Sequence, residues 1–385
     1  MDFQYTEEQQ LLADSVRRLI DKRYDFESRK RIVASPAGHS AEAWAELAGL
    51  GLLSLPFAGR DGGFGGGAVD LIATMEAIGE GLVVEPFLST LAPAGRLVAR
   101  CGSDAQRAAI LPSVIDGSTK LAFAHGERGS RYTLSQVETR AAKTADGWVL
   151  AGEKLVVLHA PMADRLVVSA RTSGGATDAS GISLFVVDAH APGLAMKTCR
   201  TVDGLRAADL ILNDLTLPAD ALLGEAGAAL PAIEEAVDFA TVLLCAEGVG
   251  AMRHANQATL EYLKTRRQFG VPIGSFQALQ HRMVDMTISA EQARSITWLA
   301  CAKVDAAARG DVDANERRRV VSAAKVRVAD ACRHVGQEAI QLHGGMGMTL
   351  EMKVAHTFRR LTMIAQQFGD ADHHLERFAA ASQLS

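Results

Sequence analysis

The sequence has few aromatic residues, few cysteines and no excess of charge of one sign. Aromatic residues make up 5% of its 385 residues, and its five cysteines are scattered without a Cys-x-x-Cys pair. An odd number of cysteines without such a pair argues against a disulfide framework. The 40 basic and 45 acidic residues give a net charge of -5, so no overall field attracts nucleic acid or an anionic membrane surface. An anionic ligand would therefore need a local basic site.

A long apolar run is also missing. The first ten residues are polar and acidic, whereas a secretory signal begins with basic residues and continues with apolar ones. The most apolar region, near residues 239–246, is flanked by acidic residues and is too short to span a bilayer. We therefore expect a protein that is not inserted in a membrane and that works in the reducing cytoplasm.

The periodicity of apolar residues divides the chain into three parts. From Thr6 to Leu111 they recur at three- and four-residue steps, which predicts helices, and from residue 121 short apolar runs between Gly, Asp and Pro predict strands. Long amphipathic patterns return near residue 230. The sequence thus predicts an α+β multidomain fold, with a helical N-terminal domain (1–120), a small β-barrel or β-sandwich middle domain (121–226) and a helical-bundle C-terminal domain (227–385).

Three local signals refine this prediction. Thr6 and Gln9 have the spacing of a capping box. Asn315 can cap a long helix that Gly344–Gly345 terminate. The stretch from Thr172 to Ser180 is rich in Gly, Ser and Asp and predicts an exposed hairpin loop.

A segment between two predicted helices combines three side chains that a nucleotide diphosphate requires. It ends one helix, turns at Gly270–Pro272 and begins another. Arg266 can bind a phosphate through two hydrogen bonds, Gln268 can act as an amide partner, and Phe269 can stack on a planar ring. Taken alone, the same residues would equally fit an ordinary helical hairpin.

The segment from Gln341 to Gly347 supplies a complementary feature. Gly344 and Gly345 carry no Cβ, so their backbone N–H groups can approach a pyrophosphate closely. Taken alone, this segment would equally be a helix C-cap. Together, the two segments favour a nucleotide-diphosphate site on the C-terminal domain.

Motifs along the whole chain resemble those of the FAD-dependent acyl-CoA dehydrogenase family. The resemblance rests on the two segments just described and on Phe3–Gln9, Leu47–Pro56, Trp148–Lys154 and Leu215–Gly224. Residues 5–30 and the segment Phe368–His374 are most similar to the small subunit of two-subunit members such as those acting on pimeloyl-CoA.

The resemblance implies a helical, a β and a second helical domain, assembled as dimers of dimers with FAD across a subunit interface. It also implies an acyl-CoA substrate and an electron-transfer flavoprotein as electron acceptor. By the same resemblance, six residues hold the FAD diphosphate and adenine of the neighbouring subunit: Arg266, Gln268, Phe269, Gln341, Gly344 and Gly345.

The sequence departs from this family at the catalytic base. The family's reaction needs a carboxylate that removes the α-proton of the substrate. Phe368 stands where most members carry that Glu, and Ala240 stands where the others carry it. The nearest carboxylates are Glu247, two helical turns beyond Ala240, and Asp370. Either could be the base, but a helix-surface Glu and a loop-capping Asp are the ordinary interpretations.

The residues that would face the flavin ring also differ. Gly126–Arg128 replaces a Thr-Glu-Pro turn of the family, and Leu158 replaces a Thr whose hydroxyl lies near flavin N5. Two hydrogen bonds to the ring are therefore expected to be lost. His373 and His374 have no second cluster at ligand spacing, so we expect no metal site.

The residues for the dinucleotide are thus retained, whereas those for the ring and the base are not. This division favours a subunit of a heteromeric enzyme in which a base-bearing partner completes the site. Together the two subunits would form the α,β double bond of a CoA thioester, such as pimeloyl-CoA or another dicarboxylyl-CoA. A steroid side-chain CoA ester is an equal substrate candidate. Two alternatives stay open, a homomeric flavoenzyme with an unusual base or other chemistry, and a structural subunit that binds no cofactor.

Overall fold

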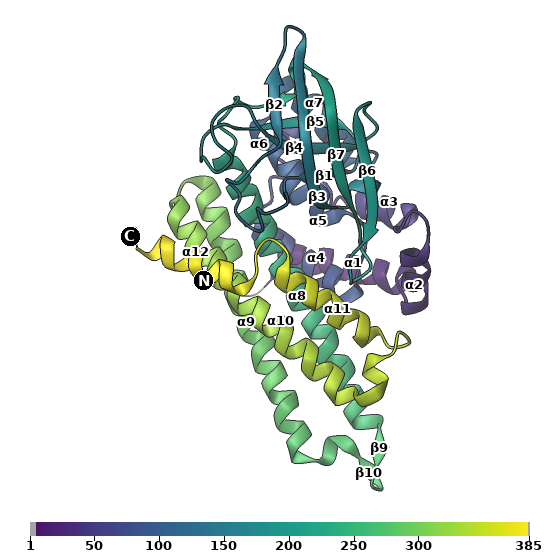
Figure 1. The fold of residues 1–385 in the computed structure, drawn as a ribbon. Coiled ribbons are helices and arrows are strands. Elements are labelled where there is room, and N and C mark those ends of the chain that lie inside the picture. The colour runs from purple at the N-terminus through teal and green to yellow at the C-terminus, as the bar shows by residue number, and fades with distance from the viewer. Residues whose placement is uncertain (1–4, 384–385) are drawn as a thin grey trace. The chain divides into compact units, whose positions relative to one another are not determined.

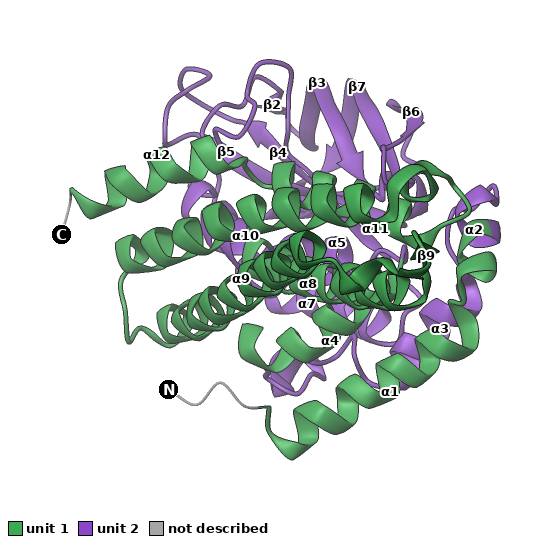
Figure 2. Cartoon of the chain, turned by 90° about the horizontal axis from the view of Figure 1, so that it is seen from below, with its two compact units in different colours: residues 1–30, 67–83, 241–385 green, residues 31–66, 84–240 purple. Residues whose placement is uncertain are grey.

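The computed structural model describes residues 5–383, so Phe3 and Gln4 of the opening motif lie outside the described residues. The chain forms two compact units (Figure 2). Unit 1 comprises residues 1–30, 67–83 and 241–385, and unit 2 comprises residues 31–66 and 84–240. Neither unit is one continuous stretch of chain. The predicted domain boundaries near residues 120 and 226 therefore remain predictions.

Unit 1 is helical (Figure 1). It contains α1 (Glu7–Arg23), α4 (Ala68–Gly81), the part of α8 (Leu230–Thr265) beyond residue 240, α9 (Gln277–Arg309), α10 (Ala314–His343), α11 (Lys353–Gln366) and α12 (Ala371–Ser382), with the short strands β9 (Arg267–Gln268) and β10 (Val271–Pro272) and the turns η5 (Ile273–Ser275) and η6 (Gly344–Met348). α10 packs against α9, α11 and α12, as expected for the predicted bundle.

No helix among the described residues is long and apolar enough to cross a membrane.

The helix ends in unit 1 test the predicted capping box of the first helix and the predicted N-cap and C-cap of the long C-terminal helix. Thr6 and Gln9 form the predicted capping box of α1, because each side chain accepts the other's backbone N–H. The predicted N-cap at Asn315 is wrong. Asp313 caps α10 instead, since its backbone is extended and its carboxylate accepts the N–H three residues later, whereas Asn315 already lies in the first turn. Gly344 is the C-cap of α10, as predicted.

Two glycines set the distance between α4 and α8. A Cβ built on Gly79 would lie 1.9 Å from the carbonyl oxygen of Glu247, and one built on Gly250 would lie 1.8 Å from that of Glu76. The helix backbones therefore touch at two positions where no side chain fits. One turn beyond this crossing, Arg253 of α8 binds the buried carboxylate of Glu76 at 2.6 Å, which fixes the register of the two helices.

Unit 2 combines a mixed sheet with short helices (Figure 1). The strands are β1 (Leu121–Ala124), β2 (Arg140–Lys143), β3 (Gly147–Leu158), β4 (Arg165–Arg171), β5 (Ile182–Asp188), β6 (Leu194–Arg200), β7 (Arg206–Pro218) and β8 (Leu222–Leu223). The helical elements are α2 (Phe26–Ala34), which begins in unit 1, α3 (Ala41–Gly49), η1 (Gly59–Asp61), α5 (Phe87–Ser89), the π-helical turn η2 (Thr90–Gly95), α6 (Arg96–Cys101), α7 (Asp104–Ile115), η3 (Ala160–Met162) and η4 (Ala219–Ala221).

The sheet confirms the predicted β region. Within the described residues the strands pair in the order β6-β7-β3-β2-β4-β5-β8, and β1 pairs with β4 in parallel. The core of the sheet includes Trp148 and Phe185, whose rings meet edge to face at 5.3 Å. The stretch from Thr172 to Ser180 connects β4 to β5, as predicted.

Asp305 of α9 caps α4 from outside that helix. Its carboxylate oxygens accept the N–H groups of Ala68 (2.6 Å) and Val69 (3.0 Å), and Gly67 at the N-cap has no side chain to do so. We expect Asp305→Ala to lower the free energy of unfolding by about 2 kcal/mol, because two N–H groups at the positive end of a helix lose a charged acceptor. Urea denaturation followed by circular dichroism measures the change.

The matched control for this prediction is Asp311→Ala. Asp311 is an exposed carboxylate that pairs with Arg309 at the surface, and its removal should cost less than about 1 kcal/mol. Equal losses in the two variants would contradict the capping role of Asp305.

Candidate functional site

The first predicted nucleotide segment is a two-stranded hairpin that joins α8 to α9 at the lower end of unit 1 in Figure 1. Arg266 follows the last residue of α8, and its carbonyl oxygen accepts the N–H of Ile273 across the hairpin (2.8 Å). Gln268 of β9 pairs with Val271 of β10. The side chains of Arg266, Gln268 and Phe269 are exposed, Phe269 to 91%. All three predicted side chains thus reach solvent instead of the helical core.

The turn of this hairpin places an aromatic residue in a conformation that favours glycine or asparagine. The backbone φ is +54° at Phe269 and +83° at Gly270, the signs found in the type I′ turns that close two-residue hairpins. A residue with a Cβ in this region is strained by about 1 kcal/mol. The ring of Phe276, 6.2 Å away and edge on, is its aromatic neighbour. An exposed and strained phenyl ring is typical of a side chain that contacts a ligand or another chain.

The second predicted segment is the end of α10 with the turn η6. Gln341 is exposed on the last helical turn, and Gly344 ends the helix with a φ of +58°. A Cβ built on Gly344 or Gly345 would meet no atom within 4 Å. The backbone of these two glycines therefore borders open space in which a phosphate oxygen fits. The N–H of Gly344 already donates to the carbonyl oxygen of Gln341.

A ring stack joins the two segments. Tyr262 lies one helical turn before Arg266, and its ring stacks on that of His343 at the end of α10, with centroids 4.5 Å apart and planes inclined by 28°. Segments that are far apart in the sequence thus meet at one end of unit 1. The donor set of a guanidinium, two amides and open glycine backbone, beside an exposed phenyl ring, fits a nucleotide diphosphate.

In the turn that carries the base in most family members, Phe368 stands at the position expected for that base. Phe368 lies between α11 and α12 with a φ of +61°. The fully buried Lys325 donates to the carbonyl oxygens of Ala365 (3.1 Å) and Gly369 (2.6 Å). His374 donates from Nε2 to the carbonyl oxygen of Phe368 (3.0 Å). The turn is therefore held by buried donors, although a phenyl ring cannot accept a proton.

The other positions considered for a base have structural contacts. Ala240 is fully buried. Glu247 is buried, and its two carboxylate oxygens accept Nε (2.6 Å) and Nη2 (2.9 Å) of Arg360. Asp370 caps α12 by accepting the N–H of His373 at 2.9 Å. These contacts favour the structural interpretation of Glu247 and Asp370, and a catalytic role for either stays a prediction.

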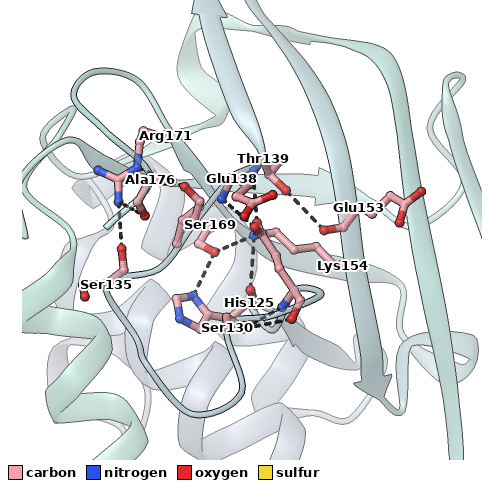
Figure 3. Close-up of polar contacts among 12 residues, drawn as sticks. His125, Ser130, Ser135, Glu138, Thr139, Glu153, Lys154, Ser169, Arg171 and Ala176 are labelled. Carbon is pink, nitrogen blue, oxygen red and sulfur yellow. Dashed lines mark hydrogen bonds and ion pairs between the residues drawn. The ribbon is translucent and has the colours of Figure 1, made fainter. Parts of the chain in front are cut away.

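In unit 2, the carboxylate of the turn expected to face a flavin binds the fully buried Lys154, which is labelled in Figure 3. Glu127 accepts Nζ of Lys154 (2.6 Å) and the N–H groups of Glu138 (2.5 Å) and Thr139 (3.1 Å). Lys154 is fully buried, and burial lowers its pKa to about 8, with the charge of Glu127 opposing the shift. Leu158, at the end of β3, brings no hydroxyl. The family's ring-facing side chains are thus turned inward or replaced by an apolar group.

A second buried cation fixes the same loop (Figure 3). Arg171 on β4 is 2% exposed. Its guanidinium donates to five backbone carbonyl oxygens at 2.8–3.1 Å, those of Ser135, Val137, Ala176, Asp178 and Ser180. Figure 3 labels Ser135 and Ala176 among these acceptors. Lys154 and Arg171 together attach the segment 125–139 to the sheet, so this long connection between β1 and β2 has a defined conformation.

The described residues contain no group of three or more His, Cys, Asp or Glu side chains that could bind a metal ion. His373 and His374 are neighbours at the start of α12, with their rings edge to face.

The sequence analysis did not identify several residues that hold the hairpin, the loop 125–139 and the turn around Phe368 in place. Tyr262 precedes Arg266 by four residues, which places both on one helix face, and this spacing was the available signal. No apolar–polar pattern shows that Lys154, Arg171 and Lys325 are buried, because charged residues are almost always expected at the surface.

We expect Phe269→Asn to stabilise the protein and to weaken FAD binding. Asn-Gly is the preferred pair for a turn with positive φ at both central residues, so the free energy of unfolding should rise by about 1 kcal/mol. Loss of the exposed ring should weaken retention of FAD, the cofactor that the sequence resemblance implies. Urea denaturation and FAD fluorescence titration measure the two effects.

The control Phe269→Leu separates the backbone from the ring. Leucine keeps the strained φ but removes the aromatic face, so stability should stay unchanged while FAD retention falls. A stabilised Leu variant, or an Asn variant with unchanged FAD affinity, would contradict this interpretation of the turn.

We also expect an acid-dependent loss of stability from His374. Burial lowers the pKa of His374 to about 2, and Lys325 and Arg377 act in the same direction. In the unfolded chain the pKa is about 6.5, so below that pH the unfolded state binds one proton more at this residue. The free energy of unfolding should therefore fall by about 1.4 kcal/mol for each pH unit between pH 6 and 4 from this residue.

Urea denaturation at pH 6, 5 and 4 tests this linkage. His374→Asn should make the pH dependence shallower by that slope, even if its stability at pH 7 is lower. His281→Asn, at an exposed position of α9, is the matched control. The same slope in wild type and His374→Asn would show that His374 is not the group that takes up the proton.

The sequence matches acyl-CoA dehydrogenase domains along most of its length. The N-terminal domain matches residues 6–118, the middle domain residues 122–216 and the C-terminal domain residues 230–382. The acyl-CoA dehydrogenase FadE12 of Mycobacterium tuberculosis is 32% identical over 337 residues, which cover 85% of this chain and 84% of FadE12.

Two solved structures have the same fold over almost the whole chain. The steroid ACAD variant Tcur3481-Tcur3483 is 30% identical with a TM-score of 0.86, covering 98% of each chain. The ChsE4-ChsE5 complex from Mycobacterium tuberculosis is 27% identical with a TM-score of 0.88, covering 100% of each chain. FAD-bound proteins are also among the matching structures. The chain therefore belongs to the acyl-CoA dehydrogenase family, whose cofactor is FAD.

Proposed function

We propose that this chain is one subunit of a heteromeric acyl-CoA dehydrogenase and that a different subunit supplies the base. The reaction forms the α,β double bond of a CoA thioester, with an α-proton leaving to a carboxylate and a hydride leaving the β-carbon. FAD, when bound, supplies the hydride acceptor at flavin N5. In this proposal the chain holds the diphosphate and adenine of that FAD with Arg266, Gln268, Phe269, Gln341, Gly344 and Gly345.

The observation that carries the proposal is the contrast between two parts of the chain. The diphosphate segments are exposed and keep their donors, whereas both family positions for the base are apolar, at Phe368 and Ala240. Glu247 has both oxygens bound by Arg360, so using it as a base would mean breaking a buried ion pair. A chain that keeps the nucleotide residues but has apolar side chains at both family positions for the base is consistent with half of a shared active site.

An exposed apolar stripe on α9 supports assembly with another chain. Val284 is 55% exposed and Ile288 is 49% exposed, one turn apart. Farther along α9, a shallow groove of about 470 Å³ is lined by Ile296 and Leu299 together with Glu291, Gln292 and Ser295. The opposite face of α9 packs in the core through Met286, Ala290, Ala293 and Trp298. Large apolar side chains exposed one turn apart on the outer face of a helix favour a partner chain there.

The substrate class and electron acceptor belong to the same proposal. We infer a CoA thioester and an electron-transfer flavoprotein as acceptor. The steroid ACAD among the similar structures supports a steroid side-chain ester, and the resemblance of residues 5–30 and 368–374 to two-subunit members supports a dicarboxylyl ester such as pimeloyl-CoA.

Native mass spectrometry of the tagged chain, purified from its own cells with its bound partners, tests the proposal. We expect a complex with a second, base-bearing chain and bound FAD. Arg266→Ala should weaken FAD retention by about 10- to 100-fold, because a charge-assisted contact to phosphate contributes about 1.5–3 kcal/mol. The measurement is the FAD dissociation constant of the purified complex.

Lys264→Ala is the matched control, because Lys264 is an exposed cation two residues away that pairs with Glu261. It should leave FAD affinity unchanged. A homotetramer that carries one FAD per chain and oxidises acyl-CoA would overturn the heteromeric proposal. Unchanged FAD affinity in Arg266→Ala would overturn the assignment of the diphosphate site.

A further inference from the structure

We propose that Tyr262 and His343 are positioning residues that hold the two halves of the FAD diphosphate site at a fixed separation. The inference rests on the proposed function of the hairpin and the glycine turn. Neither residue is assigned to contact the cofactor. Their role is to hold the end of α8 against the end of α10.

The ring stack is the direct link between the two helices. His343 is 2% exposed, and its Nδ1 donates to the carbonyl oxygen of Ala339 at 2.8 Å, which fixes the ring plane. Tyr262 is half-buried and covers that ring at a centroid distance of 4.5 Å. Offset aromatic pairs at such distances stabilise one mutual orientation of the helices that carry them.

Each ring lies next to a residue assigned to the cofactor. Tyr262 is one helical turn before Arg266, and His343 is followed directly by Gly344. A movement of either ring therefore moves the adjacent donor.

A second contact, an ion pair, joins the start of α9 to α10. Arg282 near the start of α9 binds Glu338 of α10 through Nε at 2.5 Å. Glu338 lies one turn before Gln341 on the same helix. The hairpin between α8 and α9 is thus tied to α10 on both sides, by the ring stack from α8 and by the ion pair from α9.

The hairpin needs such support because it is too short to be stable alone. Its strands have two residues each, and an isolated hairpin is marginal in water even when it is longer. The segment from Lys264 to Val271 is exposed at every residue, so it has no core of its own. Holding both segments in place before binding removes the cost of ordering them when a diphosphate binds.

Three variants test the inference. Tyr262→Leu removes the aromatic stack, Tyr262→Phe keeps the stack without the hydroxyl, and Arg282→Met breaks only the second link at a partly exposed pair. The readouts are amide hydrogen exchange of residues 344–348 in the protein stripped of FAD, and the FAD dissociation constant of the purified complex. We expect Tyr262→Leu to speed exchange in this turn and weaken FAD binding, each by tenfold or more, and Arg282→Met to do so by a smaller factor.

Tyr262→Phe should match wild type in both readouts, because it keeps the ring stack. A difference from wild type would show that the hydroxyl, and not the stack, is needed. Unchanged exchange at 344–348 in Tyr262→Leu, or faster exchange with unchanged FAD affinity, overturns the inference. If Tyr262→Leu fails to fold, unchanged exchange in Arg282→Met overturns it instead. If Arg266→Ala loses FAD and Tyr262→Leu keeps it, only the positioning role of Tyr262 is rejected. If both variants keep FAD, the proposed diphosphate site itself is rejected.

Discussion

Buried cations hold the loop 125–139 and the turn around Phe368, two parts of this protein that lack regular secondary structure. Lys154, Arg171 and Lys325 are almost inaccessible to solvent, and each donates to carbonyl oxygens of a loop or turn. Buried carbonyl groups outside helices and strands need donors from elsewhere, and an ammonium or guanidinium group supplies three or five of them. Removing one of these side chains would leave several acceptors unsatisfied, and for Lys154 also a buried carboxylate without its counter-charge.

These cations also explain how the fold can stay the same where the side chains expected for the family's chemistry differ. The turn around Phe368 keeps its shape because Lys325 and His374 bind its backbone, and neither contact depends on which side chain stands at position 368. The loop 125–139 likewise keeps its path through Lys154 and Arg171. A side chain used for catalysis can therefore change while the backbone that presented it stays, as expected if function depends on sites placed on a common fold.

Much of the fold could be predicted from the sequence, because long periodic patterns report which faces are buried. The helical and β regions, the capping box of Thr6 and the loop from Thr172 to Ser180 agree with the structure. The short strands β2 and β6 carry no such signal, since β2 reads Arg-Ala-Ala-Lys and β6 is mostly exposed. The cap of α10 was misplaced because Asp313 and Asn315 are both good caps, and only the backbone decides between them.

For the candidate site, sequence reasoning could name side chains but not their partners. The exposed positions of Arg266, Gln268 and Phe269 agree with a ligand role, yet the meeting of the hairpin with the glycine turn depends on Tyr262 and His343, which are 81 residues apart (343 minus 262). The same limit applies to Glu247. Its spacing made it a candidate base, and only the structure shows that Arg360 occupies both of its oxygens.

The contact between Asp305 and the start of α4 has a consequence for synthesis of the chain. The two partners are 237 residues apart, and α4 also needs α8, because Gly79 of α4 and Gly250 of α8 let the two helix backbones touch. Asp305 follows the end of α4 by 224 residues (305 minus 81), so at about 5–20 residues per second the ribosome completes α4 roughly 11 to 45 s before it makes the cap. For most of that interval, until the part of α8 around Gly250 has been made, a helix buried on nearly every side has none of its native cover from α8 and α9. A nascent-chain chaperone that binds apolar helices would therefore be expected to act on residues 68–81.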